Sequence, residues 1–218
     1  MLKQVPTNRA KQDPADLVLD LRVSGLQIGS TAVLGDIELS VERSETLALV
    51  GPSGVGKTSL LRIIAGLEPR YQGRCDVSGQ AAMVFQEPTL LPWRSVADNI
   101  CLTTGVSRSE AETALAEVGL ATRGNDYPNT LSLGQQRRLS LARAFACKPD
   151  LLLMDEPFVS LDPELVEEMM ALFMTLRRAH NVTTILVTHV AEEAKRLASR
   201  IVTLGGTPAV IRDGDNLG

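Results

Sequence analysis

The chain has 218 residues, of which 44% are hydrophobic and 22% are charged, and its formal net charge is −4. This length can bury a substantial core, and the composition is typical of a globular rather than a disordered protein. The acidic balance does not favour a broad nucleic-acid-binding surface, and we expect the adjacent Arg137 and Arg138 to lie on a solvated helix face. No stretch approaches the roughly 18 consecutive apolar residues of a membrane span, and the polar start is unlike a signal peptide.

The first quarter of the chain combines a tail with short strands. Residues 1–15 predict a flexible tail, so that a single domain is expected over residues 16–218. Strands are predicted where apolar residues follow a strand pattern, over residues 16–26, 36–42 and 46–50. The third strand runs directly into a glycine-rich segment, and residues 59–67 follow with helical apolar spacing.

The middle of the chain, about residues 88–148, is expected to form a helical subdomain. One of its helices begins with a capping box formed by Ser107 and Glu110. A second helix is predicted to begin near Ser132 and to end near Lys148, which precedes a proline.

The last third of the chain alternates strands with helices. Residues 150–157, DLLLMDEP, are an apolar run ending in two acids, as in a buried parallel strand with polar residues at its tip. A helix over 163–180, a buried strand over 182–189 and a helix over 191–200 are predicted to follow. This alternation predicts an α/β fold with a mainly parallel core sheet, interrupted by the helical subdomain.

The three cysteines, Cys75, Cys101 and Cys147, are far apart in the sequence and form no CxxC motif. Together with the two histidines they do not have the spacing of a zinc site. We therefore expect reduced structural thiols, as in a cytosolic protein.

Residues 51–58 fit the phosphate-binding pattern G-x-x-x-x-G-K-[ST], between a predicted strand and a predicted helix. The glycines let backbone N–H groups turn inward around phosphate oxygens, and the following helix directs its positive end to the same place. Lys57 can reach the β- and γ-phosphates of a nucleotide, and the Thr58 hydroxyl can ligate Mg²⁺. The residues expected to hold the phosphates are Gly51, Pro52, Ser53, Gly54, Val55, Gly56, Lys57, Thr58 and Ser59.

A phosphate-binding loop also needs an acid that holds the metal and a group that orients water. The strand tip in LLLMDEP offers Asp155 for the Mg²⁺ shell and Glu156 as the base or water-positioning group. An apolar run that ends in two acids is weak evidence by itself. Its place after the glycine-rich loop favours the catalytic interpretation.

Six motifs follow one another along the chain: GPSGVGKTS, a glutamine in VFQEP, LSLGQ, LLLMDEP, SLD at residues 160–162, and a histidine in LVTHV. In this order they resemble the nucleotide-binding subunits of ABC transporters, over about residues 17–204. The resemblance implies a P-loop ABC ATPase cassette with a mainly parallel core sheet, an N-terminal antiparallel β subdomain and a helical insertion. It also implies ATP and Mg²⁺ as cofactors.

The resemblance further implies roles for three residues that would be unremarkable alone. Gln86 would lie in the loop that senses Mg²⁺ and the attacking water and that connects to a transmembrane partner. His189 would contact the γ-phosphate and hold the geometry of the water. Asp162 would lie at a dimer interface and link two nucleotide sites.

The segment LSLGQ, residues 131–135, is similar to the family's signature motif, usually LSGGQ. The resemblance implies that Ser132, Gly134 and Gln135 of one subunit act on the nucleotide held by the glycine loop of a second copy. Ser132 and Gln135 also have the spacing of a capping box, so the segment is predicted to open a helix whose positive end can face an anion. Leu133 stands where the family has a glycine, which is tolerable if its backbone dihedrals are helical.

Two further departures from the family concern Ile28 and Ser44. Ile28 aligns with an aromatic residue that stacks on adenine in the family, and its aliphatic side chain is expected to weaken ATP binding by about 1 kcal/mol. Ser44 replaces a glycine in the turn before the third strand and is expected to matter little.

The resemblance implies a homodimer on the cytoplasmic face of the inner membrane, bound to permease subunits, with a periplasmic or lipid-anchored solute-binding protein in the full system. Nucleic acid is not an expected partner. EPTLLPW, which contains Trp93, and EPFVSLD are similar to the ATPases of importers for sulfonates, taurine and nitrate. An exposed Trp93 would suit docking on a protein, whereas burial under the helical insertion is the alternative.

Several other functions are alternatives to solute import. An ATPase of an exporter or lipid-moving system, and a low-turnover regulatory nucleotide-binding protein, both remain open. ATPases of DNA repair or translation fit less well, because they need long coiled-coil insertions or two cassettes in one chain.

Overall fold

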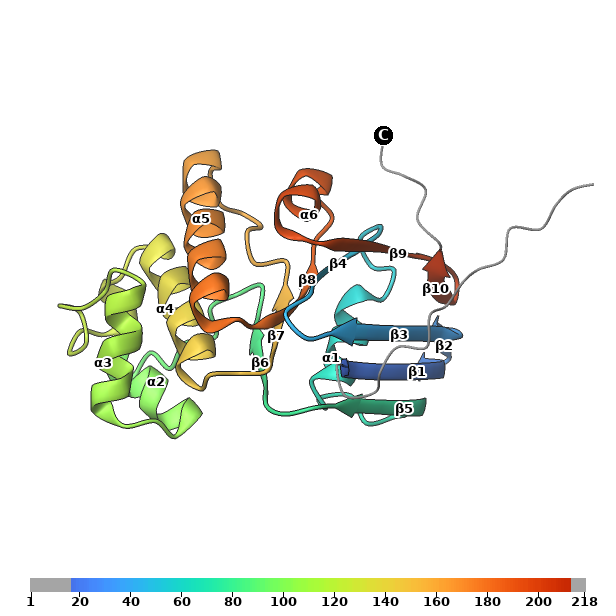
Figure 1. Ribbon diagram of the computed structural model, residues 1–218, viewed down its shortest axis with the longest axis horizontal. Coiled ribbons are helices and arrows are strands. Elements are labelled where there is room, and N and C mark those ends of the chain that lie inside the picture. Colours follow the sequence, from blue (N-terminus) through green and yellow to red (C-terminus); the bar gives the residue numbers. More distant parts are fainter. Residues whose placement is uncertain (1–16, 213–218) are drawn as a thin grey trace, which may run out of the picture.

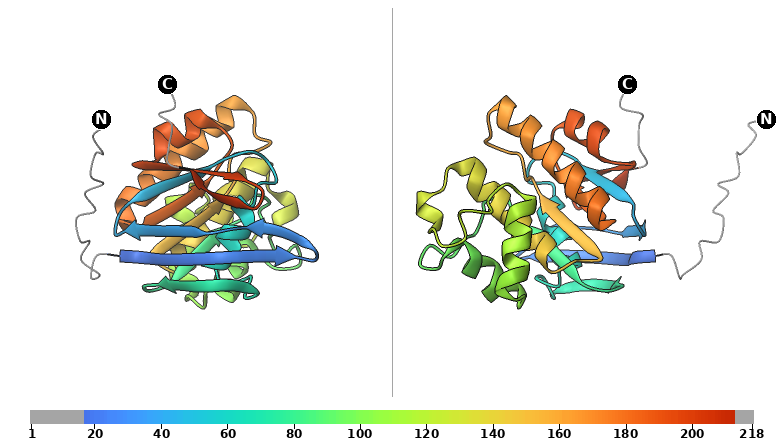
Figure 2. Two further views of the ribbon diagram at one scale, coloured as in Figure 1. Left: turned by 90° about the vertical axis from the view of Figure 1, so that its right-hand side faces the viewer. Right: turned by 60° about the vertical axis from the view of Figure 1, so that its left-hand side comes forward.

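The computed structural model describes residues 17–212. The tail expected over residues 1–15 lies outside the described residues. The described part forms one mixed sheet with helices on both of its faces (Figure 1). Helices α2, α3 and α4 gather at one end of the molecule and the antiparallel strands at the other (Figures 1 and 2).

The sheet runs in the order β3-β1-β2-β10-β9-β4-β8-β7-β6, and β5 pairs with β1. Around β1 the pairs with β2, β3 and β5 are antiparallel, whereas β9, β4, β8, β7 and β6 form parallel pairs. The strands are β1 (Leu17–Ile28), β2 (Thr31–Leu34), β3 (Ile37–Glu42), β4 (Thr46–Val50), β5 (Tyr71–Val77), β6 (Ala81–Val84), β7 (Leu151–Asp155), β8 (Thr183–Val187), β9 (Arg200–Gly206) and β10 (Ala209–Arg212). The α/β fold with an antiparallel N-terminal part and a parallel core sheet is confirmed.

The helices cover the sheet and fill the segment between β6 and β7. They are α1 (Lys57–Ile64), α2 (Val96–Thr104), α3 (Arg108–Glu117), α4 (Leu133–Ala146), α5 (Pro163–His180) and α6 (Ala191–Leu197). Both predicted capping boxes are present, at Ser107 with Glu110 and at Ser132 with Gln135. Helices α2, α3 and α4 follow one another between β6 and β7, as the resemblance implies for the helical insertion.

The core strands are buried on both faces, which explains their unbroken apolar sequences. In β7, Leu151 and Leu153 pack with α1 and the N-terminal strands. Leu152 and Met154 alternate with them and pack on the other face with the α2–α5 helices. This period of two places the two main hydrophobic clusters on opposite faces of one sheet.

Some predictions about individual elements were wrong. The helix predicted over 191–200 ends at Leu197, because β9 begins at Arg200. Strands β2, β5, β6, β9 and β10 were not predicted, since most of them are only partly buried and lack a clear apolar pattern. Arg137 does not lie on a solvated face: only 6% of its surface is exposed.

Candidate active site

The parallel register brings four motifs to one edge of the sheet. Strands β4, β8, β7 and β6 are neighbours and run in the same direction, so their carboxyl ends meet. The glycine loop follows β4, His189 follows β8, Asp155 and Glu156 end β7, and Gln86 follows β6. Residues separated by more than 130 positions in the sequence are thus placed at the same edge.

The glycine loop joins β4 to α1, and Lys57 is the first residue of that helix. The Lys57 ammonium is buried and donates hydrogen bonds to the backbone carbonyls of Gly51, at 2.8 Å, and Pro52, at 3.0 Å. Gly51 has a φ of 154°, and a Cβ there would lie 2.3 Å from the carbonyl oxygen of Leu204. Only glycine can therefore hold the loop this close to β9.

Thr58 and Asp155 form the second element of the site. The Thr58 hydroxyl donates a hydrogen bond of 3.0 Å to Asp155 Oδ1. Burial raises the pKa of the Asp155 carboxyl, and the hydrogen bond from Thr58 opposes this rise. A hydroxyl and a carboxylate are hard oxygen ligands, and Mg²⁺ in nucleotide sites is held by one or two such groups together with phosphate oxygens and water. The pair therefore fits the ion that the sequence predicts.

Glu156 lies between two cationic or ionisable partners. Its Oε1 is 3.8 Å from the Lys57 Nζ, and its Oε2 is 2.9 Å from the His189 Nδ1. The Glu156 backbone has a φ of 45°, in the left-handed region that non-glycine residues seldom occupy. Strained residues of this kind cluster at active sites, where the surrounding structure holds them in place.

The sequence did not single out two residues beside this cluster, Thr188 and Glu193. The buried Thr188 hydroxyl donates a hydrogen bond to the Glu193 carboxylate, and burial raises the pKa of Glu193. Both residues line, with Glu156 and His189, a cavity of about 260 Å³. Because Thr188 precedes His189 at the end of β8, this pair fixes the backbone that carries the histidine. Glu193 is an ionisable residue on the buried face of the short helix α6. That placement was the signal from which its role could have been predicted.

The signature segment forms the start of α4, as predicted. Ser132 is the N-cap and accepts a hydrogen bond from the Gln135 backbone N–H, while the Gln135 side chain accepts one from the Ser132 N–H. Leu133 is the first helical residue, with 47% of its surface exposed, so no glycine-only conformation is required there. At Gly134 a Cβ would lie 2.9 Å from Leu165 Cδ1, and glycine therefore allows α4 to approach α5 closely.

Asp162 lies beside the signature segment rather than beside the Lys57–Glu156 cluster. It is the N-cap of α5 and accepts a hydrogen bond of 3.0 Å from the Leu165 N–H. With Ser132, Leu133 and Gly134 it lines a cavity of about 360 Å³. The structure thus brings the predicted site residues together in two groups, and β6 and β7 lie between α4 and α1 in Figure 1.

Gln86 is exposed in the segment that connects β6 to α2. Its backbone carbonyl accepts a hydrogen bond from Arg137, on the buried side of α4. Sequence reasoning missed this contact. Arg137 is four residues before the buried Leu141 and seven before Ala144, the spacing of the packed face of a helix, and this spacing was the available signal.

The two residues that depart from the family pattern near the N-terminus occupy distinct environments. Ile28, at the end of β1, is 51% exposed. Ser44 has a φ of 64°, so the serine takes up a conformation that suits glycine, and its N–H donates a 2.9 Å hydrogen bond to Thr183 Oγ1.

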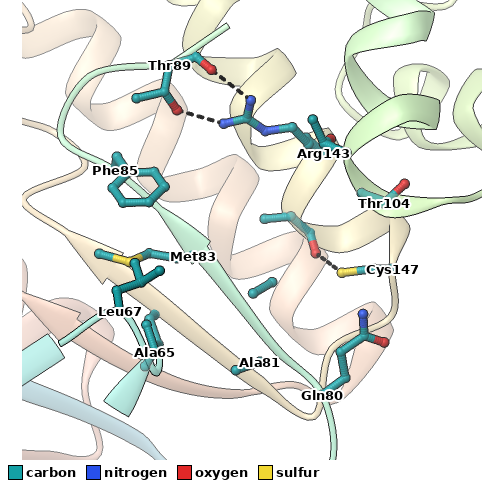
Figure 3. A pocket seen from close by; sticks show the side chains of 14 residues that line it. Ala65, Leu67, Gln80, Ala81, Met83, Phe85, Thr89, Thr104, Arg143 and Cys147 are labelled. Carbon is teal, nitrogen blue, oxygen red and sulfur yellow. Dashed lines mark hydrogen bonds between the residues drawn. The ribbon is translucent and has the colours of Figure 1, made fainter. Parts of the chain in front are cut away.

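A separate cavity of about 420 Å³ lies where the end of α1, strand β6 and helices α2 and α4 meet (Figure 3). Leu67, Met83 and Phe85 give it an apolar part, and Arg143 and Cys147 line it from α4. Leu67 in this lining and Trp93, in the segment between β6 and α2, are exposed large hydrophobic residues, at 57% and 69%. The exposure predicted as one alternative for Trp93 is therefore what the structure has.

Comparison with known proteins decides which family has this arrangement. The family described as ABC transporter matches residues 34–159, more than half of the chain and the whole stretch from the glycine loop to Glu156. The chain belongs to the ABC transporter family. It is an ATPase of that family.

Three relatives of this ABC ATPase are informative. The aliphatic sulfonates import ATP-binding protein SsuB 2 of Frankia alni is 47% identical, and the match covers 84% of this chain and 76% of that protein. The protein of the same name from Burkholderia cenocepacia is 38% identical, and the match covers 95% of this chain and 81% of that protein. A solved dimeric ATP-binding cassette in a post-hydrolysis state, bound to ADP and phosphate, is 26% identical with a TM-score of 0.78, covering 92% of this chain and 99% of that one.

Within residues 17–212, no helix is long and apolar enough to cross a membrane. In the same range all three cysteines are unpaired and half-buried, and burial raises the pKa of the Cys75 thiol to about 11. The Cys75 thiol is therefore unreactive at neutral pH, as expected of a structural thiol.

Proposed function

We propose that this ABC ATPase hydrolyses Mg-ATP as a homodimer and powers the import of a small organic sulfonate, taurine or nitrate through separate permease subunits. The observation that carries the proposal is the division of the site into two groups. Glu156 contacts both Lys57 and His189, whereas Ser132 and Gly134 line a different cavity together with Asp162.

Each group supplies part of the chemistry. The residues of the glycine loop, Gly51 to Ser59, hold the phosphates, and the Lys57 ammonium turns from the loop carbonyls to the β- and γ-phosphates. Mg²⁺, held by Thr58 and Asp155, would neutralise charge that develops on the transferred phosphoryl group. Glu156 takes the proton of the attacking water, and His189 and Gln86 hold that water and the γ-phosphate in place.

The second group completes the site from another copy of the chain. Ser132 and Gly134, at the positive end of α4, contact the γ-phosphate held by the partner, and Gln135 supports them. Asp162 lies beside them and links the two sites across the dimer. Support comes from the solved cassette that is dimeric with ADP and phosphate bound.

The permease subunits would dock on the cavity formed by α1, β6, α2 and α4, with Leu67 and Trp93 as apolar anchors. Gln86 and Trp93 belong to the same connection between β6 and α2, so docking would reach the catalytic site directly. Such a subunit lies peripherally on the cytoplasmic face of the inner membrane and works with a solute-binding protein. The names of relatives that are 38–47% identical support aliphatic sulfonates. Taurine and nitrate rest on the resemblance of EPTLLPW and EPFVSLD alone.

Growth of a deletion strain tests the proposal. Cells lacking this gene should fail to grow on taurine or ethanesulfonate as sulfur source, or on nitrate as nitrogen source, and should grow normally on sulfate and ammonium. A plasmid copy should restore growth, and the matched Lys57→Ala copy should not. Normal growth of the deletion strain on all three solutes would contradict the solute class, and restoration by Lys57→Ala would contradict ATP-driven import.

A further inference from the structure

Arg137 is a buried cation on α4. Only 6% of its surface is exposed, and within the described residues its Nε has no hydrogen-bond partner. Burial lowers the pKa of the guanidinium, opposed by the charge of the nearby Glu87. Burying a charge without a full set of partners costs stability, so an apolar side chain would suit this position on α4 better.

Arg137 contacts the backbone of the segment between β6 and α2, which carries Gln86. Its guanidinium donates a hydrogen bond to the Gln86 carbonyl. Two further residues of α4 hold the next part of the same connection: Arg143 donates to the carbonyls of Pro88 and Thr89, each at 3.0 Å, and the Ser140 hydroxyl donates to the Pro88 carbonyl at 3.1 Å.

The restrained segment, residues 86–89, is largely exposed. Gln86, Glu87 and Thr89 are exposed, and Thr89 has a φ of 45° that a β-branched residue seldom adopts. Figure 3 shows the Arg143 guanidinium reaching across the cavity to both the carbonyl and the hydroxyl of Thr89. The backbone position of Gln86 is therefore set by α4, the helix whose N-cap is the signature residue Ser132.

We propose that Arg137 is a positioning residue that fixes Gln86 relative to the signature helix, so that Gln86 and Ser132 move as one body. The inference rests on the proposed role of Gln86 in holding water and Mg²⁺. When α4 docks on the nucleotide of the partner, the Arg137 contact carries Gln86 with it. This positioning role explains why a charged residue is buried here, because an apolar side chain could not donate a hydrogen bond to the Gln86 carbonyl.

The experiment measures ATP hydrolysis by the purified full chain over a range of ATP and Mg²⁺ concentrations. Arg137→Met keeps the volume and removes the donor. It should lower kcat on the order of tenfold, raise the half-saturating Mg²⁺ concentration and change the KM for ATP by less than about twofold. Its Tm should be unchanged or higher, because the buried charge is gone. Arg137→Lys, which keeps a cationic donor, should recover part of the lost turnover.

Arg138→Met is the matched control. Arg138 follows Arg137 on α4 but bonds Val118 and Glu168 instead of the connection. Its loss should leave kcat and the Mg²⁺ dependence near wild type. An equal loss of kcat in this control would overturn the inference, because the effect would then not depend on the contact between Arg137 and Gln86.

A double-mutant cycle with Gln86→Ala separates the inference from the function on which it rests. If Arg137 acts through Gln86, adding Arg137→Met to Gln86→Ala should change kcat by less than about twofold. Multiplication of the two separate losses would overturn the positioning role and leave the role of Gln86 intact. Wild-type turnover in Gln86→Ala alone would show that the role of Gln86 is wrong, and the inference would fail with it.

Discussion

Replacing Leu133 by glycine restores the usual signature motif and tests whether the leucine limits turnover. Leu133 is the first helical residue of α4 and about half of its surface is exposed, at 47%. Removing the buried half of a leucine side chain costs about 1 kcal/mol, and glycine in a helix costs up to about 1 kcal/mol more. For a chain of 218 residues a total of about 1.5 kcal/mol corresponds to a Tm lower by roughly 3–6 °C.

Turnover measures the functional effect of the same change. The groups expected to meet phosphate, Ser132 and Gly134, keep their positions, so kcat in Leu133→Gly should stay within about tenfold of wild type. Differential scanning calorimetry and a steady-state phosphate-release assay measure the two quantities, and Leu133→Ala, which keeps helix propensity, should lose only about half as much stability. A gain in kcat of more than tenfold would identify Leu133 as a brake, and a higher Tm in Leu133→Gly would refute the helical assignment.

Two other substitutions test the site and its supporting helix. Lys57→Ala removes the buried ammonium beside Glu156 and should abolish most binding of a fluorescent ATP analogue and most hydrolysis; wild-type hydrolysis in this variant would contradict the phosphate assignment. Val190 is the N-cap of α6 and makes no side-chain capping bond. Val190→Asp should therefore raise stability by about 1 kcal/mol, or a Tm higher by roughly 2–4 °C, with no gain in the control Val190→Ala. An unchanged or lower Tm in Val190→Asp would contradict this prediction.

The features that the sequence predicted correctly are those specified by neighbouring residues. The glycine loop and the capping boxes at Ser107 and Ser132 follow from residues within a few positions of one another. The convergence of Lys57, Glu156 and His189 was implied by the family resemblance, and the aligned carboxyl ends of the parallel strands explain it.

Features that depend on distant partners could not be predicted in the same way. Arg137 contacts the Gln86 carbonyl across 51 positions, and nothing local to either residue specifies the other. The expectation of a solvated arginine failed because the general rule for charged residues overrode the helical spacing that places Arg137 on the packed face. Strands β9 and β10 depend on pairing with β4 and β2 rather than on their own apolar pattern.

One chain is proposed to hold only half of each catalytic site, and a second copy supplies the other half. Glu156→Gln should bind Mg-ATP without hydrolysing it, and so hold the closed state long enough to measure. Size-exclusion chromatography with light scattering should then give twice the mass of one chain in Mg-ATP and the mass of one chain in ADP. A single-chain mass for Glu156→Gln at saturating Mg-ATP, or unimpaired hydrolysis by this variant, would contradict the account.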